Sequence, residues 1–268
     1  MIYAAFTVYL LGIFFMALGI YRLWAEMLRP RWVSWALLPG TVVSEMAYIF
    51  GCLITGGEIR RAKLMDSGSP PSGRRKPAAS DDAEAAPTTE AAPKLRHLGP
   101  VIAAFMSILA CGAGIVIVHA LLGEPVIGQF AVGADALLRP AELPRQLPTH
   151  AAAFWDQFIL QVRLLRRMAG TWLELDWLNW RVPLFVYLAT CLSIRLAPVR
   201  RSLRATLAAV VVLAAIIAIV GVIWRQFDGL MGDIWPLVTY VWSSLLFLLA
   251  VSLLVRGAFG LVRALLQE

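Results

Sequence analysis

The feature that most constrains this chain is a set of apolar stretches long enough to cross a lipid bilayer. The first, residues 2–21, holds no charged side chain, and about 20 apolar helical residues are enough to cross a hydrocarbon core of about 30 Å. Over the whole chain 60% of residues are hydrophobic and 15% are charged, against about 45–50% and about 25% in soluble domains. These proportions exclude an ordinary soluble enzyme and predict an all-α polytopic membrane protein.

Further apolar stretches predict about six transmembrane helices in total. The second stretch, residues 32–55, is interrupted by Pro39 and Gly40. Proline removes a backbone donor and glycine is conformationally permissive, so we expect this helix to be broken near Pro39-Gly40. The other four spans are predicted near residues 98–122, 182–196, 203–224 and 235–255.

A segment of different composition separates the second span from the third. Residues 66–94 are rich in proline and alanine, carry mixed charges and contain no aromatic side chain. Such a segment buries too little apolar surface to offset the entropy of ordering it, so we predict a disordered linker. The chain therefore divides into a first pair of spans (1–65), the linker (66–94) and four further spans (95–268).

The region near 123–180 is of intermediate polarity and predicts an amphipathic helix at the membrane interface. Between residues 154 and 168, aromatic and aliphatic side chains alternate with glutamine and arginine at helical spacing, the pattern of a helix with one apolar face. Three tryptophans follow and predict an aromatic belt before the next span: Trp172, Trp177 and Trp180.

Small residues in the third predicted span indicate a site of close helix packing. Gly112 and Gly114 lie within the sequence Cys111-Gly-Ala-Gly. Small side chains allow two membrane helices to approach closely. We therefore predict Gly112 and Gly114 as helix-packing positions.

The formal net charge of +7 is explained by lipid rather than by nucleic acid. The arginines flank apolar stretches, where they contact lipid headgroups and set topology. The distribution of lysine and arginine favours both termini in the cytoplasm. We expect an integral membrane protein, of the bacterial cytoplasmic (inner) membrane, whose partners are the lipid bilayer and other membrane protein subunits, with no nucleic acid.

The second span carries an incomplete metallopeptidase motif. Residues 38–51 read LPGTVVSEMAYIFG, which resembles the site-2-protease-like intramembrane zinc metallopeptidases. In that family an apolar helix, often following Pro-Gly, carries H-E-x-x-H. Its two imidazoles bind zinc and its glutamate acts as general base. Aligned on Glu45, the two ligand positions are occupied by Ser44 and Tyr48.

A second segment is similar to the part of one branch of the family that supplies a third ligand, an aspartate. Residues 187–194 read YLATCLSI and residues 197–204 read APVRRSLR. On that alignment Ser202 stands at the aspartate position. The resemblance thus implies a helical frame in which Ser44, Tyr48 and Ser202 replace all three ligands.

The chemistry of these replacements indicates a chain without a metal. A serine hydroxyl is a poor neutral zinc donor, a tyrosine must first be deprotonated, and no four-donor set remains. Without zinc, Glu45 has no activated water to deprotonate. We expect no cofactor, no metal and no catalytic residue, with Glu45 as a remnant of the general-base position.

Three functions are compatible with these residues. The first is a non-catalytic accessory or scaffold subunit of a membrane protein complex, built on a pseudo-metallopeptidase helix bundle. The second is an active intramembrane peptidase with unusual ligands, and the third is a small channel or transporter that uses Glu45. Glu45 also has a purely structural interpretation, as a protonated or hydrogen-bonded side chain in an apolar site.

Overall fold

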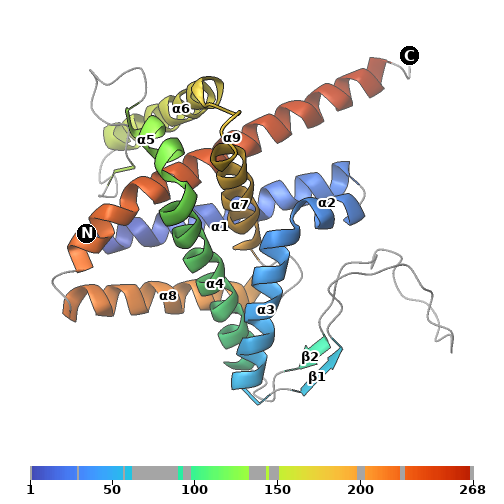
Figure 1. The fold of residues 1–268 in the computed structure, drawn as a ribbon, viewed down its shortest axis with the longest axis vertical. Coiled ribbons are helices and arrows are strands. Elements are labelled where there is room, and N and C mark those ends of the chain that lie inside the picture. Colours follow the sequence, from blue (N-terminus) through green and yellow to red (C-terminus); the bar gives the residue numbers. More distant parts are fainter. Residues whose placement is uncertain are drawn as a thin grey trace.

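A computed structural model describes residues 2–28, 30–56, 58–61, 90–92, 98–132, 143–144, 151–197, 203–223 and 227–265 (Figure 1). Apart from one small sheet, the regular structure in these ranges is helical, as the composition predicts. The helices are α1 (Ile2–Met27), α2 (Pro30–Ala36), α3 (Leu38–Ile54), α4 (Leu98–Leu122), α5 (Glu124–Val132), α6 (Ala151–Glu174), α7 (Arg181–Arg195), α8 (Leu203–Ile223) and α9 (Phe227–Leu265).

Three helices are long and apolar enough to cross a membrane. Their apolar stretches are Ala4–Met27 in α1, Gly99–Leu122 in α4 and Gly232–Val262 in α9. The chain is therefore an integral membrane protein by helix length and composition. Two further apolar helical stretches, Leu38–Ile54 and Leu207–Gly221, are shorter. The six predicted spans are thus not confirmed by length.

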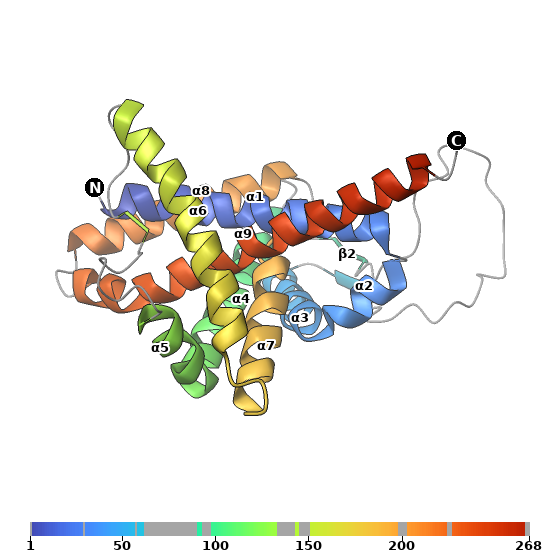
Figure 2. The same ribbon diagram turned by 90° about the horizontal axis from the view of Figure 1, so that it is seen from above.

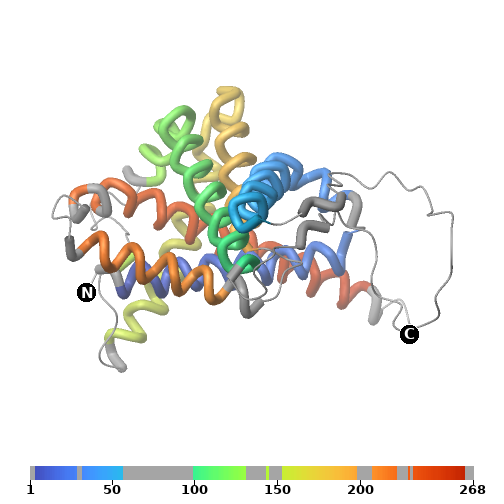
Figure 3. Tube along the Cα trace, turned by 90° about the horizontal axis from the view of Figure 1, so that it is seen from below, coloured from blue at the N-terminus to red at the C-terminus, as the bar shows by residue number. Residues whose placement is uncertain are grey.

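The helices form two sets that cross each other. In Figures 1 and 2, α1, α8 and α9 extend in a common direction, whereas α3 and α4 run across them. Helices α3, α4 and α7 pack on one another, and α1 packs along α9. Figure 3 shows α3, α4 and α7 gathered on one side of the α1, α8 and α9 set.

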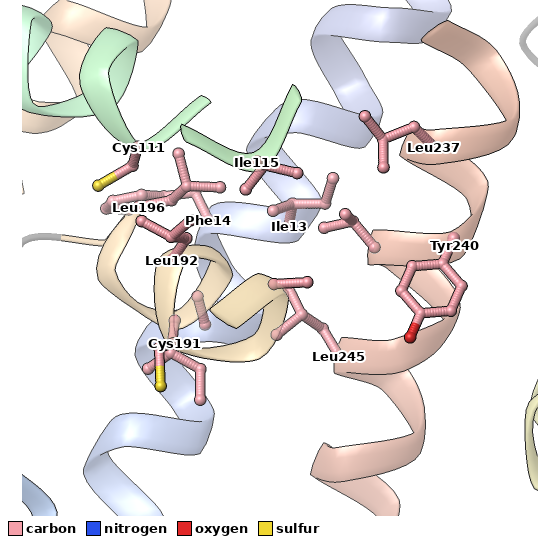
Figure 4. Close-up of a cluster of buried hydrophobic side chains, with 14 of the residues drawn as sticks. Ile13, Phe14, Cys111, Ile115, Cys191, Leu192, Leu196, Leu237, Tyr240 and Leu245 are labelled. Atoms are coloured by element: carbon pink, nitrogen blue, oxygen red, sulfur yellow. The ribbon is translucent and has the colours of Figure 1, made fainter. Parts of the chain in front are cut away.

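The core lies where these two sets meet. Figure 4 shows side chains converging there from α1, α4, α7 and α9. The largest fully buried side chain is Trp235, and its indole Nε1 donates to the carbonyl of Leu143 at 2.8 Å. The Leu143 amide in turn donates to the Thr239 hydroxyl. These two bonds anchor the connection before α6 to the first part of α9.

The last predicted span is longer than expected. The sequence predicts residues 235–255, whereas α9 is continuous from Phe227 to Leu265, with Pro236 inside it. Apolar side chains continue beyond 255, among them Phe259 and Leu261, so the helical stretch does not end at Arg256. The Arg256 guanidinium instead pairs with the Glu26 carboxylate at the end of α1.

The predicted linker lies largely outside the described residues, which omit 62–89. Strands β1 (Glu58–Arg61) and β2 (Glu90–Ala92) flank that gap and pair antiparallel, with Glu58 opposite Ala92. Strand β2 falls within the range 66–94 that the sequence assigns to the linker. The chain just before residue 62 and just after residue 89 is therefore held together beside the end of α3.

Candidate functional site: the helix break and its contact with α7

The predicted break in the second span is present and falls at Leu37. Helix α2 ends at Ala36 and α3 begins at Leu38, so Pro39 occupies the first turn of α3. Proline is favoured in a first turn because its missing N–H has no intrahelical partner there. The break therefore precedes Pro39 and Gly40 instead of coinciding with them.

Two side chains of α7 donate to the backbone at this break. The Tyr187 hydroxyl donates to the carbonyl oxygen of Ala36 at 3.0 Å, and the Cys191 thiol donates to the same oxygen at 3.4 Å. The last carbonyls of a helix have no intrahelical donor. Tyr187 and Cys191 thus satisfy an acceptor that the break creates.

Gly40 allows α3 to lie directly against α7. A Cβ atom at this position would meet the backbone carbonyl oxygen of Cys191, and it would lie 2.8 Å from the carbonyl carbon. A second close approach occurs at Gly51, where a Cβ atom would lie 2.7 Å from the Cα of Ala103 in α4. Glycines at opposite ends of α3 therefore set its distance from α7 and from α4.

The helix-packing positions predicted from the sequence behave differently from each other. A Cβ atom at Gly114 would lie 3.3 Å from the Leu192 side chain of α7, which is tighter than most Cβ contacts, so that side chain would have to shift by a few tenths of an ångström. At Gly112 it would meet no atom within 4 Å. Among the described glycines, Gly40 and Gly51 are the ones that approach the backbone of another helix closely. The sequence did not assign them to packing, although small residues in an apolar helix were the available signal.

Helix α3 presents one face to the protein and the opposite face outward. Ser44 is buried, and Glu45 and Tyr48 are half-buried. Ser44 and Tyr48 are four residues apart, so they lie on the same side of the helix. On the opposite side, more than half of each of four side chains is exposed: Met46, Phe50, Leu53 and Ile54.

The structure brings together the two segments that carry the metallopeptidase resemblance, as far as they are described. Tyr187 and Cys191 belong to the second segment. Both donate to the Ala36 carbonyl, two residues before the first segment, and the Cys191 backbone lies against Gly40 within it. Ser202, the predicted third position, lies outside the described residues.

The donor set near Glu45 contains no cluster typical of a metal centre. Among the residues that the structure describes, no three histidine, cysteine, aspartate or glutamate side chains are grouped closely enough to hold an ion. Ser44 and Tyr48 contribute hydroxyl groups only. The Ser44 and Tyr48 hydroxyl groups form a polar strip on an apolar helix, and this strip contains no pair of imidazoles or thiolates.

Comparison with known proteins finds no match for this chain. No family model matches the sequence, and no curated protein and no solved structure matches it.

The paired donors on Ala36 lead to a double-mutant test. Tyr187→Phe and Cys191→Ala should each lower the free energy of unfolding by about 0.5–1.5 kcal/mol, because the Ala36 carbonyl keeps its other donor in each single variant. The double variant should cost more than the sum, since it removes both α7 donors from the Ala36 carbonyl. Thermal unfolding of the purified protein in detergent measures all three. Strictly additive losses would contradict the shared acceptor.

Proposed function

We propose that this chain is a non-catalytic integral membrane protein that serves as an accessory or scaffold subunit of a membrane protein complex. We further propose six spans, formed by α1, α3, α4, α7, α8 and α9, in the bacterial inner membrane with both termini in the cytoplasm. The likeness of residues 38–51 and 187–204 to site-2-protease-like metallopeptidases supports the view that the helical frame derives from such an enzyme.

The absence of catalysis is supported by the chemistry of the motif positions. Hydrolysis by a metallopeptidase requires two imidazoles that hold zinc and a glutamate that deprotonates the bound water. Ser44 and Tyr48 stand where those imidazoles would be. A serine–base mechanism would require a histidine or lysine beside Ser44, and α3 contains neither.

The observation that carries the scaffold function is the outward face of α3. Met46, Phe50, Leu53 and Ile54 are each more than half exposed there, whereas Ser44 on the opposite side is buried. Contiguous exposed apolar side chains mark surfaces that bind a protein or a membrane. A membrane protein partner that packs on this face buries all four side chains.

The geometry of the break supports the same function. Helix α3 is fixed to α7 by the close approach at Gly40 and by the two donors on Ala36, and to α4 by the close approach at Gly51. Its outward face is therefore presented on a rigid support. Recognition surfaces built on fixed elements lose less conformational entropy on binding than flexible ones do.

Isolation of the full-length protein from its native membrane in a mild detergent tests this function. We expect a membrane protein to remain bound in a fixed ratio to the wild-type chain. Phe50→Ala with Leu53→Ala should lose that protein, because both side chains lie on the outward face of α3 and are more than half exposed.

A matched control is available at the exposed end of α9. Leu254→Ala with Phe259→Ala removes similar apolar area from exposed positions of a different helix, and it should retain the bound protein. A wild-type chain that is always recovered alone and monomeric would contradict the scaffold function. Equal loss of the bound protein in both double variants would contradict the assignment to α3.

A further inference from the structure

Helix α6 has an outward face that combines exposed apolar side chains with arginine. Its inner face packs on α9, where Leu164 and Met168 are fully buried and the Trp242 indole Nε1 donates to the Gln161 side-chain oxygen Oε1 at 2.6 Å. The outward side chains include Phe154, Trp155, Phe158 and Val162, each more than half exposed. The apolar side of this amphipathic helix is therefore turned partly away from the protein.

Two exposed arginines accompany this apolar face. Arg163 and Arg166 follow Val162 and are both exposed. Trp155, Val162 and Arg166 are spaced by seven and four residues, so they share one stripe of the helix. Arginine on such a stripe lays its methylene groups along an apolar surface and carries its guanidinium to the polar boundary.

We propose that the outward face of α6 binds a bilayer surface that carries anionic headgroups, with Arg163 and Arg166 contacting lipid phosphates. Helices with an apolar face and basic residues lie in the interfacial plane and are attracted to anionic lipid. The guanidinium group suits phosphate because its donors match two oxygens at once. Charge complementarity thus favours lipid phosphate over an uncharged apolar partner.

The corner after α6 continues this surface. Leu178 is 98% exposed and Trp180 is 64% exposed, in a turn fixed by the bonds from Leu178 N to Asp176 Oδ1 and from Arg181 N to Asn179 Oδ1. Leu173, on the same stripe as Trp155, is 88% exposed. Tryptophan is enriched at the headgroup level of membranes. The corner therefore extends the apolar contact beyond Arg166.

The first test compares lipids with the full-length protein in nanodiscs of phosphatidylcholine alone or with phosphatidylglycerol. We expect phosphatidylglycerol to raise the thermal unfolding midpoint of the wild type by a few degrees. Arg163→Gln with Arg166→Gln should abolish that rise. The charge-conserving control, Arg163→Lys with Arg166→Lys, should keep most of it. The proposal is overturned if both lipids act equally on the wild type, or if the glutamine variant keeps the full response.

The second test locates α6 relative to the bilayer. A spin label at Trp155→Cys should be more accessible to oxygen than to a water-soluble nickel chelate, because it lies on the apolar stripe. The matched label at Asp156→Cys is exposed at the edge of this face, seven residues before Arg163. It should lie at the headgroup level and be more accessible to the nickel chelate than the label at position 155. The three native cysteines are buried and should not react. A label at position 155 that is open to nickel, or shielded from both reagents, overturns the proposal, and the shielded result indicates a protein partner.

Discussion

Gly40→Ala should destabilise the protein by about 1–3 kcal/mol, the usual cost of forcing extra volume into a packed site. The added methyl group would meet the Cys191 carbonyl, and that carbonyl belongs to the backbone of α7. A backbone group cannot turn aside as a flexible side chain can, so α3 and α7 must separate. Separation also lengthens the bonds from Tyr187 and Cys191 to Ala36. The thermal unfolding midpoint in detergent should fall accordingly.

Gly112→Ala is the matched control. This substitution adds the same methyl group to a helix where no atom lies within 4 Å of the new Cβ. Because alanine favours a helix more than glycine does, it should be neutral or stabilising by up to about 1 kcal/mol. Equal unfolding midpoints for Gly40→Ala and Gly112→Ala would show that α3 and α7 do not meet at Gly40.

Trp235→Ala should cost more than any other single substitution considered, about 3–5 kcal/mol. The indole is fully buried, packs near the rings of Phe6 and Tyr9, and donates to the Leu143 carbonyl. Alanine leaves a cavity and an unsatisfied acceptor at once. The expected result is a large fall in the unfolding midpoint, or a protein that does not accumulate in the membrane.

Two comparison variants separate the causes. Trp235→Phe retains most of the apolar volume and removes the donor, so it should cost about 1–3 kcal/mol. Trp180→Ala removes an indole that is 64% exposed, and its effect should stay within about 0.5 kcal/mol. If Trp235→Ala is as mild as Trp180→Ala, the indole of Trp235 is not in the core.

Much of the helical organisation follows from the sequence because its signals are local. The apolar stretch of α4 is long and uninterrupted, and both of its bounds match the predicted span 98–122. Helix α1 begins as predicted but continues six residues beyond the predicted 2–21, to Met27. Pro39 predicts the break in the second span to within two residues, since the break falls at Leu37. The sequence also places an amphipathic helix at α6, because apolar and basic side chains alternate there with helical spacing.

What the sequence did not predict depends on contacts between distant segments. Nothing local to Gly40 indicates that Cys191, 151 residues away, will lie against it. The anchoring of Leu143 by Trp235 and Thr239 joins residues more than 90 positions apart. The packing of α4 across α8 likewise has no signature in hydropathy, which reports length and polarity but not direction.

The candidate site was predicted in part. The resemblance directed attention to residues 38–51 and 187–194, and these segments do meet in the structure through Gly40 and Cys191. The hydrogen bonds that hold the break come instead from Tyr187 and Cys191, to which the sequence reasoning gave no role of their own. A side-chain donor to a main-chain carbonyl leaves no spacing pattern, because the acceptor is present in every residue.

The most direct test of the central claim is the zinc content of the full-length protein, purified without chelators from cells supplied with zinc. The proposed alignment places Ser44 and Tyr48 at the two imidazole positions, so we predict far less than one zinc per chain, unchanged by Glu45→Gln. Ser44→His with Tyr48→His restores the motif residues and serves as the positive control for metal uptake. One zinc per wild-type chain, together with peptide hydrolysis that Glu45→Gln abolishes, would contradict a non-catalytic frame.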